Sequence, residues 1–233
     1  IACLGGAPPV PSLPFIPILA LAAAPMLSPP LHAQTFDLLV REGLLLDGTS
    51  NPSVRADAGV RDGEIVAVGD LASATSTRTI DAGGLYVVPG FIDMHSHADR
   101  SLFGGDARLR SAANLVAQGI TTLVFGPDGR NPAWPLRDEI AGYRDGGVGA
   151  NVVPMVGHGT VRGRVMGDDY ARHATEDEIR RMVAEVRSGM AEGAWGLGSG
   201  PEYRPGRFST SEEIIALAEV VSEYAGFHYS LQR

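Results

Sequence analysis

Hydrophobic and polar positions follow two different rhythms along the chain. Up to residue 88 the apolar positions form short runs separated by tight turns, beginning with Phe36–Val40 and Leu44–Leu46. Residues 60–68 alternate around Asp62–Gly63, a pair that favours the positive φ angles of a two-residue hairpin turn. The pattern predicts a small β unit over residues 34–84, too small to bury a large core by itself.

From residue 85 onward, apolar runs of strand length alternate with helical patterns. Strands are predicted at 85–88, 121–125, 151–156, 194–197 and 227–231. Helices are predicted between them, at 111–118 and after two capping boxes, Thr175–Glu178 and Thr210–Glu213. Strands separated by capped helices imply a parallel sheet. The predicted fold class is therefore α/β: an incomplete TIM (β/α)8 barrel of about five strands over 85–233, preceded by a small β-sandwich segment.

Residues 1–33 have the character of a leader. An apolar stretch at 13–26 has the size of a signal-peptide core, and Leu31–Ala33 offers a cleavage site. The stretch is short for a membrane span and is broken by prolines. We expect export to the periplasm or beyond, with no membrane association after cleavage. The alternative is a Pro/Ala-rich leader on a cytoplasmic protein.

Composition narrows the chemistry. The 233 residues carry a net charge of -8 without a basic run, which argues against a nucleic-acid partner. The only cysteine is Cys3, and all 19 basic residues are arginine. Without lysine the chain can form neither a carbamylated-lysine bridge between two metals nor a Schiff base.

The most informative motif is Pro-Gly-Phe-Ile-Asp-Met-His-Ser-His-Ala-Asp, residues 89–99, which contains His95 and His97. On a strand, residues i and i+2 point to the same face. Two imidazoles side by side at a strand end suit a divalent metal. The alternative is a pair of surface histidines.

Other polar segments also follow predicted strands. In a parallel barrel the active site lies at the C-terminal ends of the strands, so these segments are candidates for the same site. They are Gly126–Arg130, Gly157–Arg162, Ser199–Gly206 and Tyr229–Arg233.

Four motifs in order carry a family resemblance: Pro-Gly-Phe-Ile-Asp-x-His-x-His, Gly-Ile-Thr-Thr, Val-Gly-His-Gly and Gly-x-x-Ser-Gly-x-x-Tyr-x-Pro-Gly. Over about residues 36–230 the chain resembles the N-terminal portion of the N-acyl-D-amino-acid deacylase (D-aminoacylase) group of the amidohydrolase superfamily. The resemblance implies a composite amidohydrolase domain and one or two Zn²⁺ ions. It also implies a hydrolase acting on carbon-nitrogen bonds other than peptide bonds, with small N-acyl-D-amino acids as substrates.

The resemblance assigns roles residue by residue. His95 and His97 match metal ligands, and Asp128 stands where D-aminoacylases place a metal-binding cysteine. A carboxylate can bind or bridge zinc, although Asp128 could also be only a turn residue before Gly129. His158 matches a family histidine, either as a ligand or as a supporting residue. Tyr203 matches a tyrosine of the substrate pocket.

One departure and two rival interpretations remain. Leu231 stands where the family has a ligating histidine, and the resemblance places the general-base aspartate beyond residue 233. We therefore expect this chain alone to be an inactive fragment of an active parent. The rivals are an amidohydrolase of cyclic amides, as in dihydroorotases and hydantoinases, and a non-catalytic barrel fragment. The cyclic-amide enzymes usually bridge their metals with a lysine, which is absent here.

Overall fold

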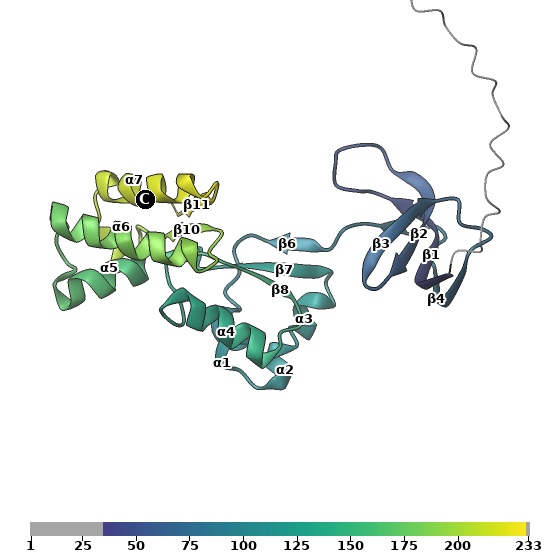
Figure 1. Cartoon of the computed structure of the whole chain (residues 1–233), viewed down its shortest axis with the longest axis horizontal. Coiled ribbons are helices and arrows are strands. Elements are labelled where there is room, and N and C mark those ends of the chain that lie inside the picture. The colour runs from purple at the N-terminus through teal and green to yellow at the C-terminus, as the bar shows by residue number, and fades with distance from the viewer. Residues whose placement is uncertain (1–34, 232–233) are drawn as a thin grey trace, which may run out of the picture. The chain divides into compact units, whose positions relative to one another are not determined.

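The computed structural model describes residues 35–231, which fall into two compact units, one ending at Val87 and one beginning at Val88 (Figure 1). The leader predicted at 1–33 and its cleavage site lie outside the described residues. Within 35–231, no helix combines the length and the apolar character needed to cross a bilayer.

The first unit is one mixed sheet. Its strands are β1 (Thr35–Leu45), β2 (Val54–Arg61), β3 (Glu64–Gly69), β4 (Thr75–Asp81) and β5 (Tyr86–Val87). The order is β3-β2-β1-β4, with β5 also paired to β1. The predicted hairpin is confirmed: β2 and β3 pair antiparallel, and the turn residues Asp62 and Gly63 have φ of 53° and 80°. Phe36 and Leu39 of β1 are buried, as are Ala58 and Ala82 of the same unit.

The predicted strand at 85–88 is placed differently. Tyr86 and Val87 pair in parallel with Leu44 and Leu45 of β1, so this segment belongs to the first unit. The first strand of the second unit is β6 (Phe91–Asp93), after Pro89–Gly90. Proline offers no backbone N–H to a strand ladder, so the apolar run is split between two sheets.

The second unit is built on parallel strands with helices between them, which confirms the α/β class. β6 pairs with β7 (Ile120–Phe125), and β7 pairs with β8 (Asn151–Pro154). After Met155, β9 (Val156–Gly157) pairs with β10 (Gly196–Ser199), which pairs with β11 (Phe227–Ser230). Thus β8 and β9 divide one predicted strand, and the strands neighbour each other in chain order.

The helices of this unit are α1 (Asp99–Gly104), α2 (Ala107–Arg110), α3 (Ala113–Val116), α4 (Leu136–Gly146), α5 (His158–Met166), α6 (Glu176–Ala191) and α7 (Ser211–Glu223). The helix predicted at 111–118 is confirmed only over α3, Ala113–Val116. Ala112 adopts a left-handed conformation with φ of 48°, which separates α2 from α3. Such a conformation cannot continue a right-handed helix.

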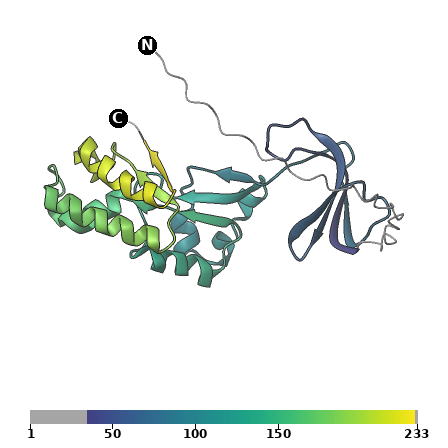
Figure 2. The same ribbon diagram turned by 45° about the horizontal axis from the view of Figure 1, so that its top comes forward.

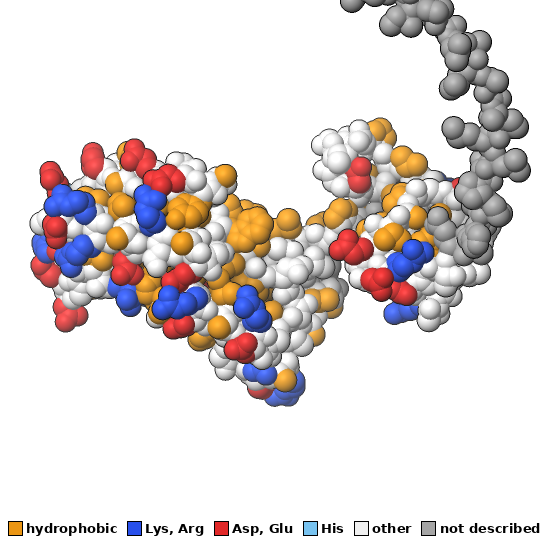
Figure 3. All heavy atoms as spheres, in the orientation of Figure 1, with side chains coloured by type: hydrophobic (Ala, Val, Ile, Leu, Met, Phe, Trp, Pro, Cys, Tyr) orange, Lys and Arg blue, Asp and Glu red, His pale blue; other side chains and the backbone are white. Residues whose placement is uncertain are grey.

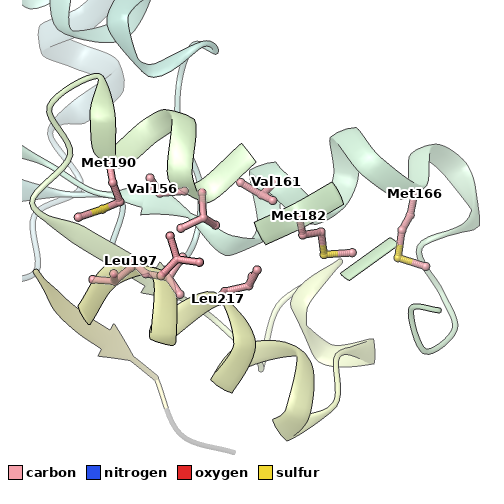
Figure 4. Packing of buried hydrophobic residues seen from close by; sticks show 10 residues of the cluster. Val156, Val161, Met166, Met182, Met190, Leu197 and Leu217 are labelled. Carbon is pink, nitrogen blue, oxygen red and sulfur yellow. The ribbon is translucent and has the colours of Figure 1, made fainter. Parts of the chain in front are cut away.

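Helices α6 and α7 lie side by side against the strands β9 and β10 (Figures 1 and 2). Between them lies a core of buried aliphatic and methionine side chains, shown in Figure 4: Val156, Val161, Met166, Met182, Val186, Met190, Leu197, Leu217, Val220 and Val221. Outward positions of these helices carry charged side chains of both signs, which are visible in Figure 3. This core packs helices α5, α6 and α7 against strands β9 and β10.

Candidate metal centre

The two histidines of the motif converge, although they do not lie on a strand. Strand β6 ends at Asp93, and His95 and His97 follow in the turn. The Asp93 carboxylate accepts a hydrogen bond from the His95 backbone N–H at 3.1 Å. The Nε2 atoms of His95 and His97 then lie 3.1 Å apart. The prediction that the two rings lie close together is correct, but strand alternation is not the reason. A turn stabilised by Asp93 brings the rings together.

Asp128 completes the cluster from the loop that follows β7. Its Oδ1 lies 3.4 Å from His95 Nε2, and its Oδ2 lies 3.4 Å from His97 Nε2. One ligand atom from each of the three residues falls within 4.8 Å of the others. Oδ1 of Asp128 is buried and has no hydrogen-bond partner among the described residues. A buried carboxylate oxygen without a donor is costly unless a cation takes that place.

Bare backbone beneath the loop fixes the position of Asp128. Gly129 has φ of 80°, a backbone conformation that residues with a side chain rarely adopt. The loop can therefore turn sharply after Asp128. A Cβ on Gly198 of β10 would overlap the carbonyl oxygen of Gly126. The loop can approach β10 this closely only because Gly198 has no side chain.

A tyrosine from the candidate segment Tyr229–Arg233, to which the sequence assigned no individual role, contacts the cluster. The hydroxyl of Tyr229, on β11, lies 3.0 Å from His95 Nδ1, and the two rings meet edge to face. Tyr229 precedes Leu231 by two residues and so shares its strand face. That relation to the expected ligand position was the available signal in the sequence.

A cavity of about 460 Å³ adjoins the cluster. His97 and Asp128 line it together with Tyr203, whose side chain the resemblance assigns to the substrate pocket. Two cationic side chains, Arg100 and Arg130, line the same cavity. The guanidinium of Arg130 is held by the backbone carbonyl of Arg204 at 2.7 Å.

His158 is not part of the cluster. It is fully buried at the start of α5, and its Nε2 donates to Glu213 Oε1 of α7 at 2.7 Å. The other Glu213 oxygen accepts from Arg162, also fully buried. Burial works to raise the pKa of Glu213, but the hydrogen bonds from His158 and Arg162 outweigh it and lower that pKa. In this structure His158 joins two helices and supports the strand ends.

Two imidazoles and a carboxylate are a donor set that zinc uses. Catalytic zinc sites commonly have three protein ligands and leave a further position open. His95, His97 and Asp128 meet this requirement, and the unpaired oxygen of Asp128 fits a cation.

The fold and the cluster define a class: α/β proteins with a candidate metal centre at the carboxyl ends of parallel strands. Residues 78–227 match the Amidohydrolase family, and the chain belongs to that family.

The most similar relatives support the resemblance predicted from the motifs. D-aminoacylase of Alcaligenes xylosoxydans xylosoxydans is 37% identical over 223 residues, which cover 86% of this chain and 45% of that protein. A D-aminoacylase structure described with a binuclear metal centre has a TM-score of 0.74 at 35% identity, covering 83% of this chain and 44% of the other.

N-acyl-D-glutamate deacylase from Bordetella bronchiseptica, complexed with zinc and a phosphonate inhibitor, has a TM-score of 0.78 at 30% identity. That match covers 84% of this chain and 45% of the other. The chain thus spans less than half the length of each of these three relatives.

Proposed function

We propose that the protein carrying this chain hydrolyses the amide bond of N-acyl-D-amino acids with the help of bound metal. The observation that carries the proposal is the convergence of His95, His97 and Asp128 beside a cavity large enough for a small molecule. D-aminoacylase and N-acyl-D-glutamate deacylase, which cover 86% and 84% of this chain at 37% and 30% identity, support the substrate class.

The strand order supports a proposal about architecture. Parallel strands that neighbour each other in chain order, with helices between them, are how a (β/α)8 barrel begins. We infer that β6 to β11 are the first part of a TIM barrel and that the sheet of the first unit belongs to a β-sandwich. Export of the protein remains part of the proposal and depends on residues 1–33.

His95, His97 and Asp128 would hold one or two zinc ions through imidazole nitrogens and carboxylate oxygens. Zinc in such a site supplies Lewis-acid chemistry, polarising a carbonyl and lowering the pKa of water to about 7. For this role both histidines bind as neutral imidazoles and Asp128 as a carboxylate.

The cavity residues bind and orient the substrate. Tyr203 offers a hydroxyl on the cavity wall, and Arg100 and Arg130 place positive charge where an N-acyl amino acid carries its carboxylate. The family resemblance places the general base beyond residue 233, so we propose that residues 1–233 alone do not turn over substrate.

Zinc binding and substrate choice test the proposal separately. Purified chain, stripped of metal, should bind zinc in a competition titration against a chromogenic chelator. The longer protein that carries this chain should release amino acid from N-acetyl-D-methionine or N-acetyl-D-glutamate in preference to their L-enantiomers. Opening of hydantoin or dihydroorotate without deacylation would instead establish the cyclic-amide alternative.

A further inference from the structure

We propose that Tyr229 is a positioning residue for the metal centre, accepting a hydrogen bond from His95 and so fixing the nitrogen that faces the metal. The proposal rests on the proposed function, because it requires that His95 is a ligand. It adds a residue from β11, the strand that carries Leu231 where the resemblance predicts a ligand.

The geometry determines which nitrogen of His95 is free. Nε2 points into the cluster, 3.1 Å from His97 Nε2 and 3.4 Å from Asp128 Oδ1. Nδ1 points the other way, 3.0 Å from the Tyr229 hydroxyl. A neutral imidazole carries one proton, and a nitrogen that binds metal cannot carry it. With Nε2 as the ligand atom, the proton sits on Nδ1 and is donated to the Tyr229 oxygen.

His95 and His97 differ in this respect. Among the described residues, His95 has a hydrogen-bond partner on the nitrogen opposite the cluster, whereas the hydrogen bond and the ion pair of His97 both involve its Nε2. The side chain of His95 is 33% exposed and that of His97 is 63% exposed. His95 is therefore the more strongly oriented imidazole of the pair, and Tyr229 supplies the orientation.

The strand pairing explains why Tyr229 can do this from a distant part of the chain. β11 is in register with β10, with Tyr229 opposite Gly198, the glycine on which the Asp128 loop rests. Tyr229 pairs with Gly198 of β10, and the Asp128 loop packs against the same glycine. A loss of the Tyr229 hydroxyl should change the orientation of His95 without moving Asp128.

The test is zinc affinity of the metal-stripped chain, measured by chelator competition, for the wild type and for Tyr229→Phe. Partners of ligating histidines typically contribute about 10- to 100-fold to metal affinity, and we expect Tyr229→Phe to weaken zinc binding by that factor. Tyr203→Phe is the matched control, since this tyrosine lines the adjoining cavity, and its zinc affinity should equal that of the wild type.

A spectroscopic measurement separates positioning from a general loss of structure. In the zinc-loaded wild type, the Nδ1–H proton of His95 should give a slowly exchanging NMR signal. The signal should vanish or exchange rapidly in Tyr229→Phe, while the thermal melt of the metal-free variant is unchanged.

The outcomes are distinguishable. Equal zinc affinity of Tyr229→Phe and wild type, or a protected His95 signal in the variant, overturns the role of Tyr229 and leaves the proposed function standing. Failure of the wild type itself to bind zinc overturns the proposed function, and the role of Tyr229 with it.

Discussion

At the scale of single residues, position 128 determines what kind of metal site the chain can build. The family resemblance implies a cysteine at this position in D-aminoacylases, whereas this chain has an aspartate with one buried oxygen that accepts no hydrogen bond among the described residues. Both side chains become anionic zinc ligands, thiolate at about 2.3 Å and carboxylate at about 2.0–2.2 Å. The site therefore has the same charge with a harder donor.

Asp128→Asn should weaken zinc binding by more than about 100-fold, because an amide neither carries the charge nor satisfies the cation. Asp128→Cys should retain tight binding, since it restores an anionic ligand. Chelator competition measures both. Asp99→Asn is the control, a carboxylate on the same cavity but outside the cluster. Comparable losses in the asparagine variants at 99 and 128 would remove Asp128 from the ligand set.

Glu139 should make the second unit sensitive to pH. Burial raises the pKa of Glu139 to about 7, and the nearby Asp99 adds to the rise, while hydrogen bonds from Asn131 and Tyr143 oppose it. The folded state then holds a proton that the unfolded state releases at a lower pH. The free energy of unfolding should fall as pH rises from 5 to 8, by up to about 3 kcal/mol.

The variant Glu139→Gln tests this pH dependence, because glutamine has nearly the same shape as glutamate. Glutamine keeps an oxygen for Asn131 and cannot ionise, so chemical denaturation at a series of pH values should give a flatter profile than the wild type. The same steep decline in both proteins would assign the pH dependence to other groups.

The site shows what single residues reveal in a sequence and what they conceal. His95, His97 and Asp128 were predicted because each lies within a local motif. Tyr229 begins the candidate segment 229–233, but its contact with His95 could not be predicted, because the two residues are 134 positions apart and only the fold brings them together. His158 was open between ligand and support, and the choice depended on Glu213, 55 positions further on.

At the scale of elements, local sequence signals correctly predicted where helices α6 and α7 begin. Thr175 and Glu178 form a full capping box at α6. At α7 only half of the box forms: Thr210 accepts from the Glu213 N–H, but the Glu213 side chain turns inward to His158 and Arg162. Both helices begin with the same Thr-x-x-Glu pattern. At α7 the buried partners of Glu213, and not the pattern, determine that its side chain does not complete the capping box.

Thr175→Ala should lower the free energy of unfolding by about 1 kcal/mol, the usual contribution of a helix N-cap. Urea denaturation of the chain measures the change. Ser222→Ala, which alters an exposed hydroxyl near the end of α7, should change it by less than about 0.5 kcal/mol. Equal effects of the two would show that the cap at α6 contributes little.

Two element predictions failed for reasons outside the apolar pattern. The run at 85–88 has strand character, but which sheet it joins depends on pairing with β1. The helix predicted at 111–118 forms only over Ala113–Val116, because Ala112, a residue whose type gives no hint of it, adopts a left-handed conformation. The periodicity of apolar residues indicates which positions are buried. It does not indicate which strands pair or where the backbone leaves a regular conformation.

At the scale of the whole molecule, the open ends of the parallel sheet have consequences. Among the described strands, β6 pairs only with β7 and β11 only with β10. Phe91 and Ile92 of β6 are 59% and 60% exposed. Apolar side chains beside an unpaired strand edge favour association with other chains.

We expect residues 1–233, expressed alone, to self-associate with increasing concentration. Ile92→Lys should shift sedimentation velocity profiles towards monomer, because charge on an edge strand opposes pairing. Ile215→Lys is the control, since Ile215 is similarly exposed, at 56%, but lies on helix α7 rather than on a strand. A monomer at all concentrations would contradict the expectation, as would equal effects of the two lysines.

Gly198, which lies beneath the loop of residues 126–129, separates the position of the ligand at residue 128 from its chemical type. Because Gly198 lets the main chain of residues 126–129 settle directly onto β10, the height of the loop above the sheet does not depend on what side chain position 128 displays. A change of the ligand atom at position 128 from carboxylate oxygen to thiolate sulfur should therefore leave the location of the ligand unchanged. In contrast, a methyl group at Gly198 would lift the loop and disable every version of the centre at once.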